Sequence, residues 1–123
     1  MQADPNLTEV PVERRRQPRL NFMEPVQFRD LLKADSLFYG SIGCDLGAGG
    51  MRIRNYAPMA KGDRLLILMD LPDSRRVVRA ITRVVWQSQM PLGPSYETGL
   101  QFIEIAPEDR DSISGWVERG VVS

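Results

Sequence analysis

Short segments in which apolar and polar residues alternate, separated by glycine and proline, run from Phe22 to Glu104. Successive side chains of a β-strand point to opposite faces, so this alternation indicates strands with one buried face. The expected strands are 26–29, 36–44, 51–54, 65–71, 77–86 and 96–105. Six short strands at this spacing predict an antiparallel β-barrel or β-sandwich.

The C-terminal part of the chain changes its hydrophobic period. Pro107 suits the first turn of a helix, where its missing N–H would have no helical partner. The acidic residues that follow favour the positive end of a helix dipole. Ile113, Trp116 and Val117 then recur at helical spacing and form a narrow apolar stripe. The sequence therefore predicts a terminal helix that covers one end of the strands.

Length and charge limit the class of protein. A chain of 123 residues is sufficient for one domain with one hydrophobic core. Its net charge of zero argues against a general binder of nucleic-acid polymers or membrane surfaces. No stretch approaches the roughly 18 consecutive apolar residues that span a bilayer, so we expect no membrane insertion. The single cysteine, Cys44, has no partner for an internal disulfide, and the simplest location is the cytoplasm.

The chain contains no histidine. This absence excludes histidine-dependent triads, imidazole acid–base chemistry and most types of zinc site. Cys44 without a histidine is a poor nucleophile, and we expect a small buried residue within a strand. With no acid–base or nucleophilic set of residues, the sequence predicts a protein that is not an enzyme and needs no metal or cofactor.

An arginine-rich segment precedes the first strand. Residues 1–13 mix prolines with polar and acidic residues and predict a flexible tail. Arg14, Arg15, Arg16 and Arg19 follow, and Pro18 makes a helix unfavourable there. Four like charges this close repel one another unless water or an anion neutralises them. The segment is therefore either a solvated basic patch or a clamp for a phosphate-containing ligand.

A second segment, residues 45–50 (DLGAGG), lies between two expected strands. Its glycines permit a tight turn and a close approach of a ligand to the main chain. Asp45 has two readings, because its carboxylate can complete a turn or accept hydrogen bonds from the N1–H and N2–H₂ edge of a guanine. The segment lacks the Lys-Ser/Thr of a P-loop and no helix pattern follows it, which excludes both common nucleotide-binding motifs.

Other conspicuous residues have simpler interpretations. Four arginines alternate along strands and are expected on solvated outer faces: Arg52, Arg54, Arg79 and Arg83. Arg83 is the first of these that we would add to a site, because its strand leads to Trp86. Trp86 and Trp116 are expected in the core or against the helix.

Together the two segments resemble the PilZ family of cyclic di-GMP receptors, which pairs an Arg-x-x-x-Arg motif with an Asp/Asn-x-Ser-x-x-Gly motif. Residues 15–19 (RRQPR) supply the first motif completely. Residues 45–50 supply the second except at Gly47, where the family has serine. Residues 83–86 (RVVW) and 98–102 (TGLQF) look like late PilZ strands, and the likeness extends over about residues 12–120.

The resemblance implies an all-β fold, a six-stranded antiparallel β-barrel with a C-terminal α-helix, over residues 14–123. It implies cyclic di-GMP as the ligand, with Arg15 and Arg19 at its phosphates and guanine faces. Asp45 would bind a guanine edge, and Gly50 would form the close backbone turn. An additional arginine, here Arg14, often accompanies two stacked ligand molecules in this family.

The ligand site implied by the resemblance departs from the family pattern at Gly47. Loss of the serine hydroxyl removes one hydrogen bond, on the order of 1 kcal/mol or about fivefold in affinity, although the backbone remains available to the ligand.

The resemblance also implies how such a protein signals. Ligand binding would order the arginine segment against the barrel and create a surface for an unidentified protein effector. An alternative is a degenerate adaptor of the same fold that binds no nucleotide and acts only through protein contacts. A nucleic-acid binder is a third reading, which the neutral net charge disfavours. A homodimer is compatible with the sequence, which does not fix the oligomeric state.

Overall fold

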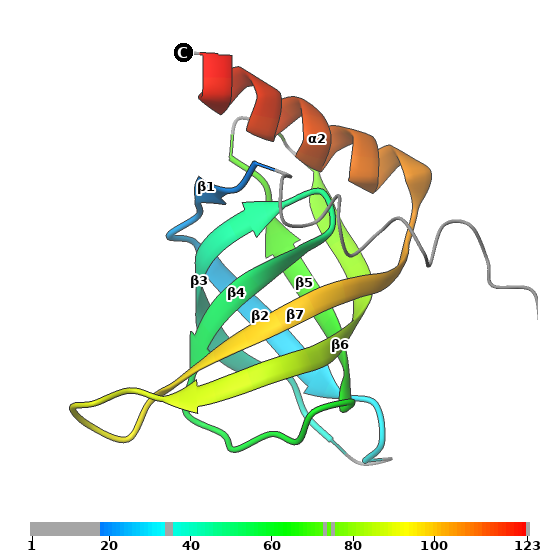
Figure 1. The fold of residues 1–123 in the computed structure, drawn as a ribbon. Helices are drawn as coiled ribbons and strands as arrows, with labels where there is room; N and C mark the ends of the chain where they lie inside the picture. The colour runs from blue at the N-terminus through cyan, green and yellow to red at the C-terminus, as the bar shows by residue number, and fades with distance from the viewer. Residues whose placement is uncertain (1–17, 34–35, 73, 75, 123) are drawn as a thin grey trace, which may run out of the picture.

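The computed structural model describes residues 18–33, 36–72, 74 and 76–122. Six of its strands close an antiparallel barrel in which each strand pairs with two neighbours, and β1 adds one short strand to β3 (Figure 1). The order of pairing is β1-β3-β2-β5-β6-β7-β4, and a further β3–β4 ladder closes the ring. The strands are β1 Leu20–Asn21, β2 Pro25–Asp30, β3 Tyr39–Gly47, β4 Gly50–Asn55, β5 Arg64–Asp70, β6 Val77–Gln89 and β7 Tyr96–Ile105.

The interior of the barrel is filled by the inward half of the alternating pattern. One row crosses four strands: Leu46 pairs with Met51, Met51 with Leu100, and Leu100 with Val84. Each of these side chains is at most 1% exposed. Burial of a large apolar side chain contributes about 1.5–3 kcal/mol, so such rows determine the strand register. The register in turn assigns the alternate residues to the outer face.

Helix α2, Pro107–Val122, lies across one end of the barrel (Figure 1). Ile113 and Val117 are buried beneath it, as the apolar stripe predicts, and Trp116 packs edge-on against Phe22. Asp109, in the first turn, accepts a 2.6 Å hydrogen bond from Arg76 Nε. The helix is therefore held at its N-terminal end by an ion pair and along its length by the core. No helix within the described part of the chain is long and apolar enough to cross a membrane.

The barrel and the terminal helix confirm the expected fold, but some strand bounds differ from those predicted and one strand was not predicted. The strand expected over 36–44 begins at Tyr39 and continues through Gly47. Most of the second segment, residues 45–50, is therefore strand rather than loop. Only Ala48 and Gly49 form the turn, and Gly47 pairs directly with Gly50. The two-residue strand β1 was not predicted, because it has too few residues to show a period.

Candidate functional site

Two β-bulges bring the second motif and a tryptophan to the same outer face. In β3 the register shifts between Gly43 and Asp45, so that Cys44 is the extra residue. In β6 a similar shift lies between Val84 and Trp86. A bulge reverses the inward–outward alternation of the residues that follow it. Gly43 faces the core and Asp45 the outside, and likewise Val84 is buried whereas Trp86 is 42% exposed.

The outward residues form one continuous row across four strands. Asp45 on β3 pairs with Arg52 on β4, Arg52 pairs with Gly99 on β7, and Gly99 pairs with Trp86 on β6. The Trp86 indole lies against Gly99, where any larger side chain would collide with it. The row therefore joins a carboxylate, a guanidinium and an exposed aromatic ring. The expectation that Trp86 belongs to the core was wrong, because the bulge turns it outward.

The end of the first motif lies directly on this row. Residue Arg19 precedes β1, whose Asn21 pairs with Asp45. Arg19 Nη1 donates to Asp45 Oδ1 at 3.3 Å. The structure thus joins one residue of each motif across 26 positions of sequence. Arg14 and Arg15, the other arginines assigned to the ligand, lie outside the described residues, as does the predicted tail 1–13.

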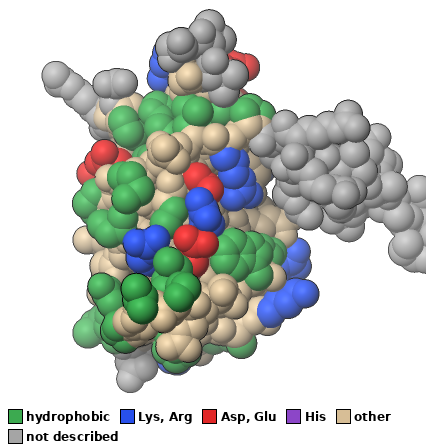
Figure 2. Space-filling model, turned by 60° about the vertical axis from the view of Figure 1, so that its left-hand side comes forward, with side chains coloured by type: hydrophobic (Ala, Val, Ile, Leu, Met, Phe, Trp, Pro, Cys, Tyr) green, Lys and Arg blue, Asp and Glu red, His purple; other side chains and the backbone are tan. Residues whose placement is uncertain are grey.

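The ion pairs continue beyond Asp45. Arg52 Nη2 lies 3.0 Å from Asp45 Oδ2, and Arg52 Nη1 donates to Glu97 Oε1 at 3.1 Å. Arg54 Nη2 lies 4.0 Å from the second oxygen of Glu97. Figure 2 shows basic and acidic side chains interspersed over the middle of one face of the molecule. We call the five residues Arg19, Asp45, Arg52, Arg54 and Glu97 the ion cluster.

Arg52 is the centre of the ion cluster. Burial lowers its pKa, but the carboxylates of Asp45 and Glu97 outweigh that effect and raise the pKa above its ordinary value. Arg52 thus lies on the outer face as predicted, but it is paired with two carboxylates rather than simply solvated. Nearby, burial raises the pKa of the Cys44 thiol and the charges of Arg52 and Arg54 oppose this shift. Cys44 is half-buried in the bulge rather than fully buried.

Gly47 and Gly50 of the second motif lie where a side chain would collide with a neighbouring segment. A Cβ at Gly47 would lie 2.9 Å from both the Pro18 carbonyl oxygen and Arg19 Cγ. The absence of a side chain therefore lets the end of the arginine segment lie directly on β3. A Cβ at Gly50 would collide with the Leu100 carbonyl oxygen of β7. Gly50 thus permits the close approach of β4 to β7, which sequence reasoning attributed to a turn.

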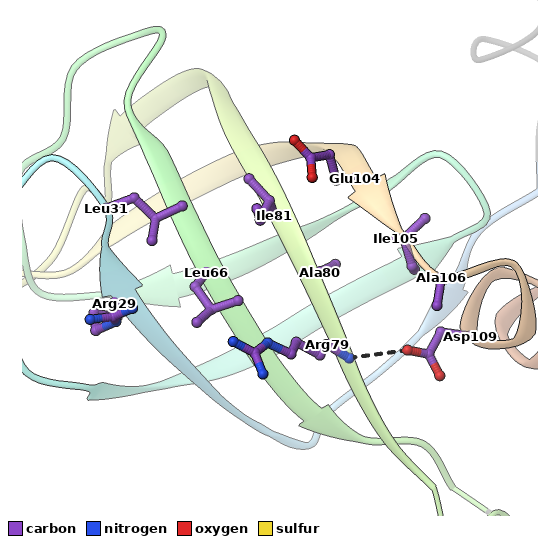
Figure 3. Close-up of a pocket in the computed structure, with 10 residues that line it drawn as sticks. All are labelled: Arg29, Leu31, Leu66, Arg79, Ala80, Ile81, Glu104, Ile105, Ala106 and Asp109. Atoms are coloured by element: carbon purple, nitrogen blue, oxygen red, sulfur yellow. Dashed lines mark hydrogen bonds between the residues drawn. The ribbon is translucent and has the colours of Figure 1, made fainter.

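The remaining outward arginines differ in their surroundings. Arg83 donates to Gln101 Oε1 at 2.6 Å, on the face where Gln101 pairs with Gly50. Arg79 lies on the other side of the barrel, beside a shallow groove of about 480 Å³ (Figure 3). Its lining is Arg29, Leu31, Leu66, Arg79, Ala80, Ile81, Glu104, Ile105, Ala106 and Asp109. This groove includes no residue of the ion cluster, so the two regions are separate surfaces.

The comparisons with known proteins agree with this fold. The PilZ domain family model matches residues 13–119. The fold is similar to that of the Bacillus subtilis inhibitor of motility MotI/DgrA, with a TM-score of 0.74 and 18% identity over 89% of this chain and 51% of that one. No curated protein sequence matches the chain significantly.

Two further similar structures contain cyclic di-GMP. The PilZ domain of Escherichia coli YcgR with c-di-GMP gives a TM-score of 0.66 and 18% identity over 88% of this chain and 94% of that one. The Klebsiella pneumoniae MrkH–c-di-GMP complex gives a TM-score of 0.62 and 15% identity over 87% of this chain and 52% of that one. The chain spans about half the length of the MotI and MrkH chains. The family match over almost the whole described barrel and helix establishes that the chain belongs to the PilZ domain family.

Proposed function

We propose that the chain is a receptor for cyclic di-GMP, which it binds on the face that carries the ion cluster. The observation that carries this proposal is the contact between Arg19 and Asp45, which joins the two motifs at one place on the barrel. PilZ domain structures of similar fold contain this ligand. The binding residues we propose are Arg14, Arg15, Arg19, Asp45, Gly47 and Gly50.

The chemistry of this face suits a cyclic dinucleotide. Guanidinium groups bind phosphodiester anions and the O6/N7 edge of guanine, and Asp45 accepts from the opposite guanine edge. Each Asp45 oxygen already pairs with an arginine: Oδ1 lies 3.3 Å from Arg19 Nη1 and Oδ2 lies 3.0 Å from Arg52 Nη2. A carboxylate has about four lone-pair sites, so Asp45 retains acceptors for a base. Trp86, exposed at the end of the row, offers a flat surface for stacking.

A ligand at Arg19 would act on the C-terminal helix. β1 follows Arg19 immediately, and its Leu20 lies against Gly120 of α2. Ordering of residues 14–19 by the ligand would therefore change the position of β1 and α2 at this end of the barrel. We propose that this change presents a surface to a protein effector, with no enzymatic step. Arg14 would support a second, stacked ligand molecule.

A second candidate function is an adaptor that binds no nucleotide. Gly47 favours it, since the serine of the family motif is absent and the arginine segment occupies the space of its side chain. The two candidates differ in one respect that can be measured, the response of the fold to the ligand.

Saturating cyclic di-GMP is expected to raise the free energy of unfolding by about 2–3 kcal/mol, because a ligand that binds only the folded state stabilises it by mass action. The measurement is thermal unfolding with and without the ligand. Arg15→Gln/Arg19→Gln should abolish the shift, whereas Arg79→Gln/Arg110→Gln, which removes the same charge elsewhere, should retain it. Equal unfolding of the wild type with and without ligand would favour the adaptor.

Restoring the family serine is expected to give little gain. Gly47→Ser adds a hydroxyl, but its Cβ would displace the backbone at Pro18 or the Arg19 side chain, both 2.9 Å away. We expect the affinity for cyclic di-GMP to rise by less than about twofold, below the fivefold that one added hydrogen bond would provide. Calorimetric titration of both proteins measures the ratio. A gain in affinity of fivefold or more would show that Pro18 and Arg19 can move away from β3 at little cost.

A further inference from the structure

The guanidinium of Arg52 is shared between two carboxylates on different strands. Its Nη2 faces Asp45 on β3 at 3.0 Å, and its Nη1 donates to Glu97 on β7 at 3.1 Å. Its Nε is buried and has no hydrogen-bond partner among the described residues. The side chain is still 35% exposed, so a ligand on this face can reach it. Arg52 therefore lies at the proposed site with both terminal nitrogens already engaged.

We propose that Arg52 is an additional ligand-binding arginine and that Glu97 lowers the affinity of the site by competing for it. The proposal rests on the proposed function, since the ligand is the cyclic dinucleotide bound at Arg19 and Asp45. Its phosphodiesters need the same donors that Glu97 occupies. The family motifs include neither residue.

Glu97 opposes ligand binding in two ways. It occupies Arg52 Nη1, and its negative charge offsets the positive charge of Arg52 that would attract the anion. Neutralising it removes the charge, and glutamine in its place keeps an oxygen that can still orient Arg52. Asp45 differs from Glu97, because it lies between Arg19 and Arg52 and is itself assigned to the base. The two carboxylates of the ion cluster therefore have opposite effects on the ligand.

Arg54 also forms an ion pair with Glu97, but its Nη2 lies farther away, 4.0 Å from Glu97 Oε2. Removal of the Glu97 charge also releases Arg54, and a gain in affinity has to be assigned to one of the two arginines. A double-mutant cycle makes this assignment. If Glu97 acts through Arg52, its neutralisation has no effect once Arg52 is absent.

The experiment is calorimetric titration of cyclic di-GMP into the whole chain and four variants. We expect Glu97→Gln to bind about fivefold more tightly, Arg52→Gln about tenfold more weakly, and the double variant to match Arg52→Gln within twofold. Glu104→Gln is the matched control, because it removes the same charge from the same strand. Glu104 is an exposed glutamate of β7, about 20 Å from Glu97 along the strand.

Each outcome decides a separate point. Equal affinity of Glu97→Gln and the wild type would overturn the role of Glu97, and unchanged affinity of Arg52→Gln would overturn that of Arg52, while the proposed function stands. A gain that persists in the double variant would show that Glu97 does not act through Arg52. Absence of binding in every protein, with unfolding temperatures like that of the wild type, would overturn the inference and the proposed function together.

Discussion

Replacement of Gly50 by alanine is expected to destabilise the fold by about 3 kcal/mol, at the upper end of the usual cost of overpacking. The Cβ of alanine would collide with the Leu100 carbonyl oxygen and lie 3.2 Å from Gln101 Cα. Both contacts are with backbone, which cannot rotate away, so β4 and β7 would have to separate. Because the β4–β7 ladder is part of the closed barrel, thermal unfolding should shift downward by about 10 °C.

Gly40→Ala is the control for Gly50→Ala. Gly40 lies on β3 and a Cβ there would have nothing within 4 Å. We expect unchanged or slightly raised stability, because alanine restricts the unfolded chain more than glycine does. Equal unfolding temperatures for the two variants would contradict the packing role of Gly50.

Replacement of Asp45 by alanine is expected to weaken binding of cyclic di-GMP by about 100-fold or more, because hydrogen bonds to a charged group contribute about 1.5–3 kcal/mol each. The carboxylate holds Arg19 and Arg52 in place and is the proposed acceptor for the guanine edge. Its loss leaves the two arginines mutually repelling as well as the base unpaired. Calorimetric titration measures the ratio of dissociation constants.

Two variants separate the roles of Asp45. Asp45→Asn retains one acceptor oxygen and loses the charge, and an intermediate loss of about tenfold is expected. Asp70→Ala removes an exposed carboxylate at the end of β5, and its affinity should equal that of the wild type. Equal affinities of Asp45→Ala and the wild type would exclude Asp45 from the site.

The alternation of residues was sufficient to predict an antiparallel barrel or sandwich, because each inward row is apolar across neighbouring strands, and the resemblance to the PilZ family specified the barrel. The same alternation failed for Trp86. Counting in twos from Val78 and Val84, both buried, places Trp86 inside, and only the extra residue in the β6 bulge reverses this. A bulge depends on the pairing of two strands, so it has no signature in either strand alone.

The candidate site was predictable at Arg19 and Asp45 and not beyond them. Both belong to motifs, and the structure brings them into contact. Arg52 and Glu97 belong to no motif and lie 45 positions apart, on strands whose register becomes known only with the fold. Opposite charges on neighbouring strands were the available signal, but every exposed barrel face offers several such pairings.

The most direct measurement is calorimetric titration of the wild-type chain with cyclic di-GMP and, separately, with cyclic di-AMP. The two ligands share their phosphodiesters and differ in the base edge that Asp45 and the arginines would read. We expect saturable binding of cyclic di-GMP and at least about tenfold weaker binding of cyclic di-AMP, because adenine lacks the N1–H and N2–H₂ donors. Equal affinity for both would reduce the site to a phosphate clamp, and absence of heat with cyclic di-GMP would contradict the receptor function itself.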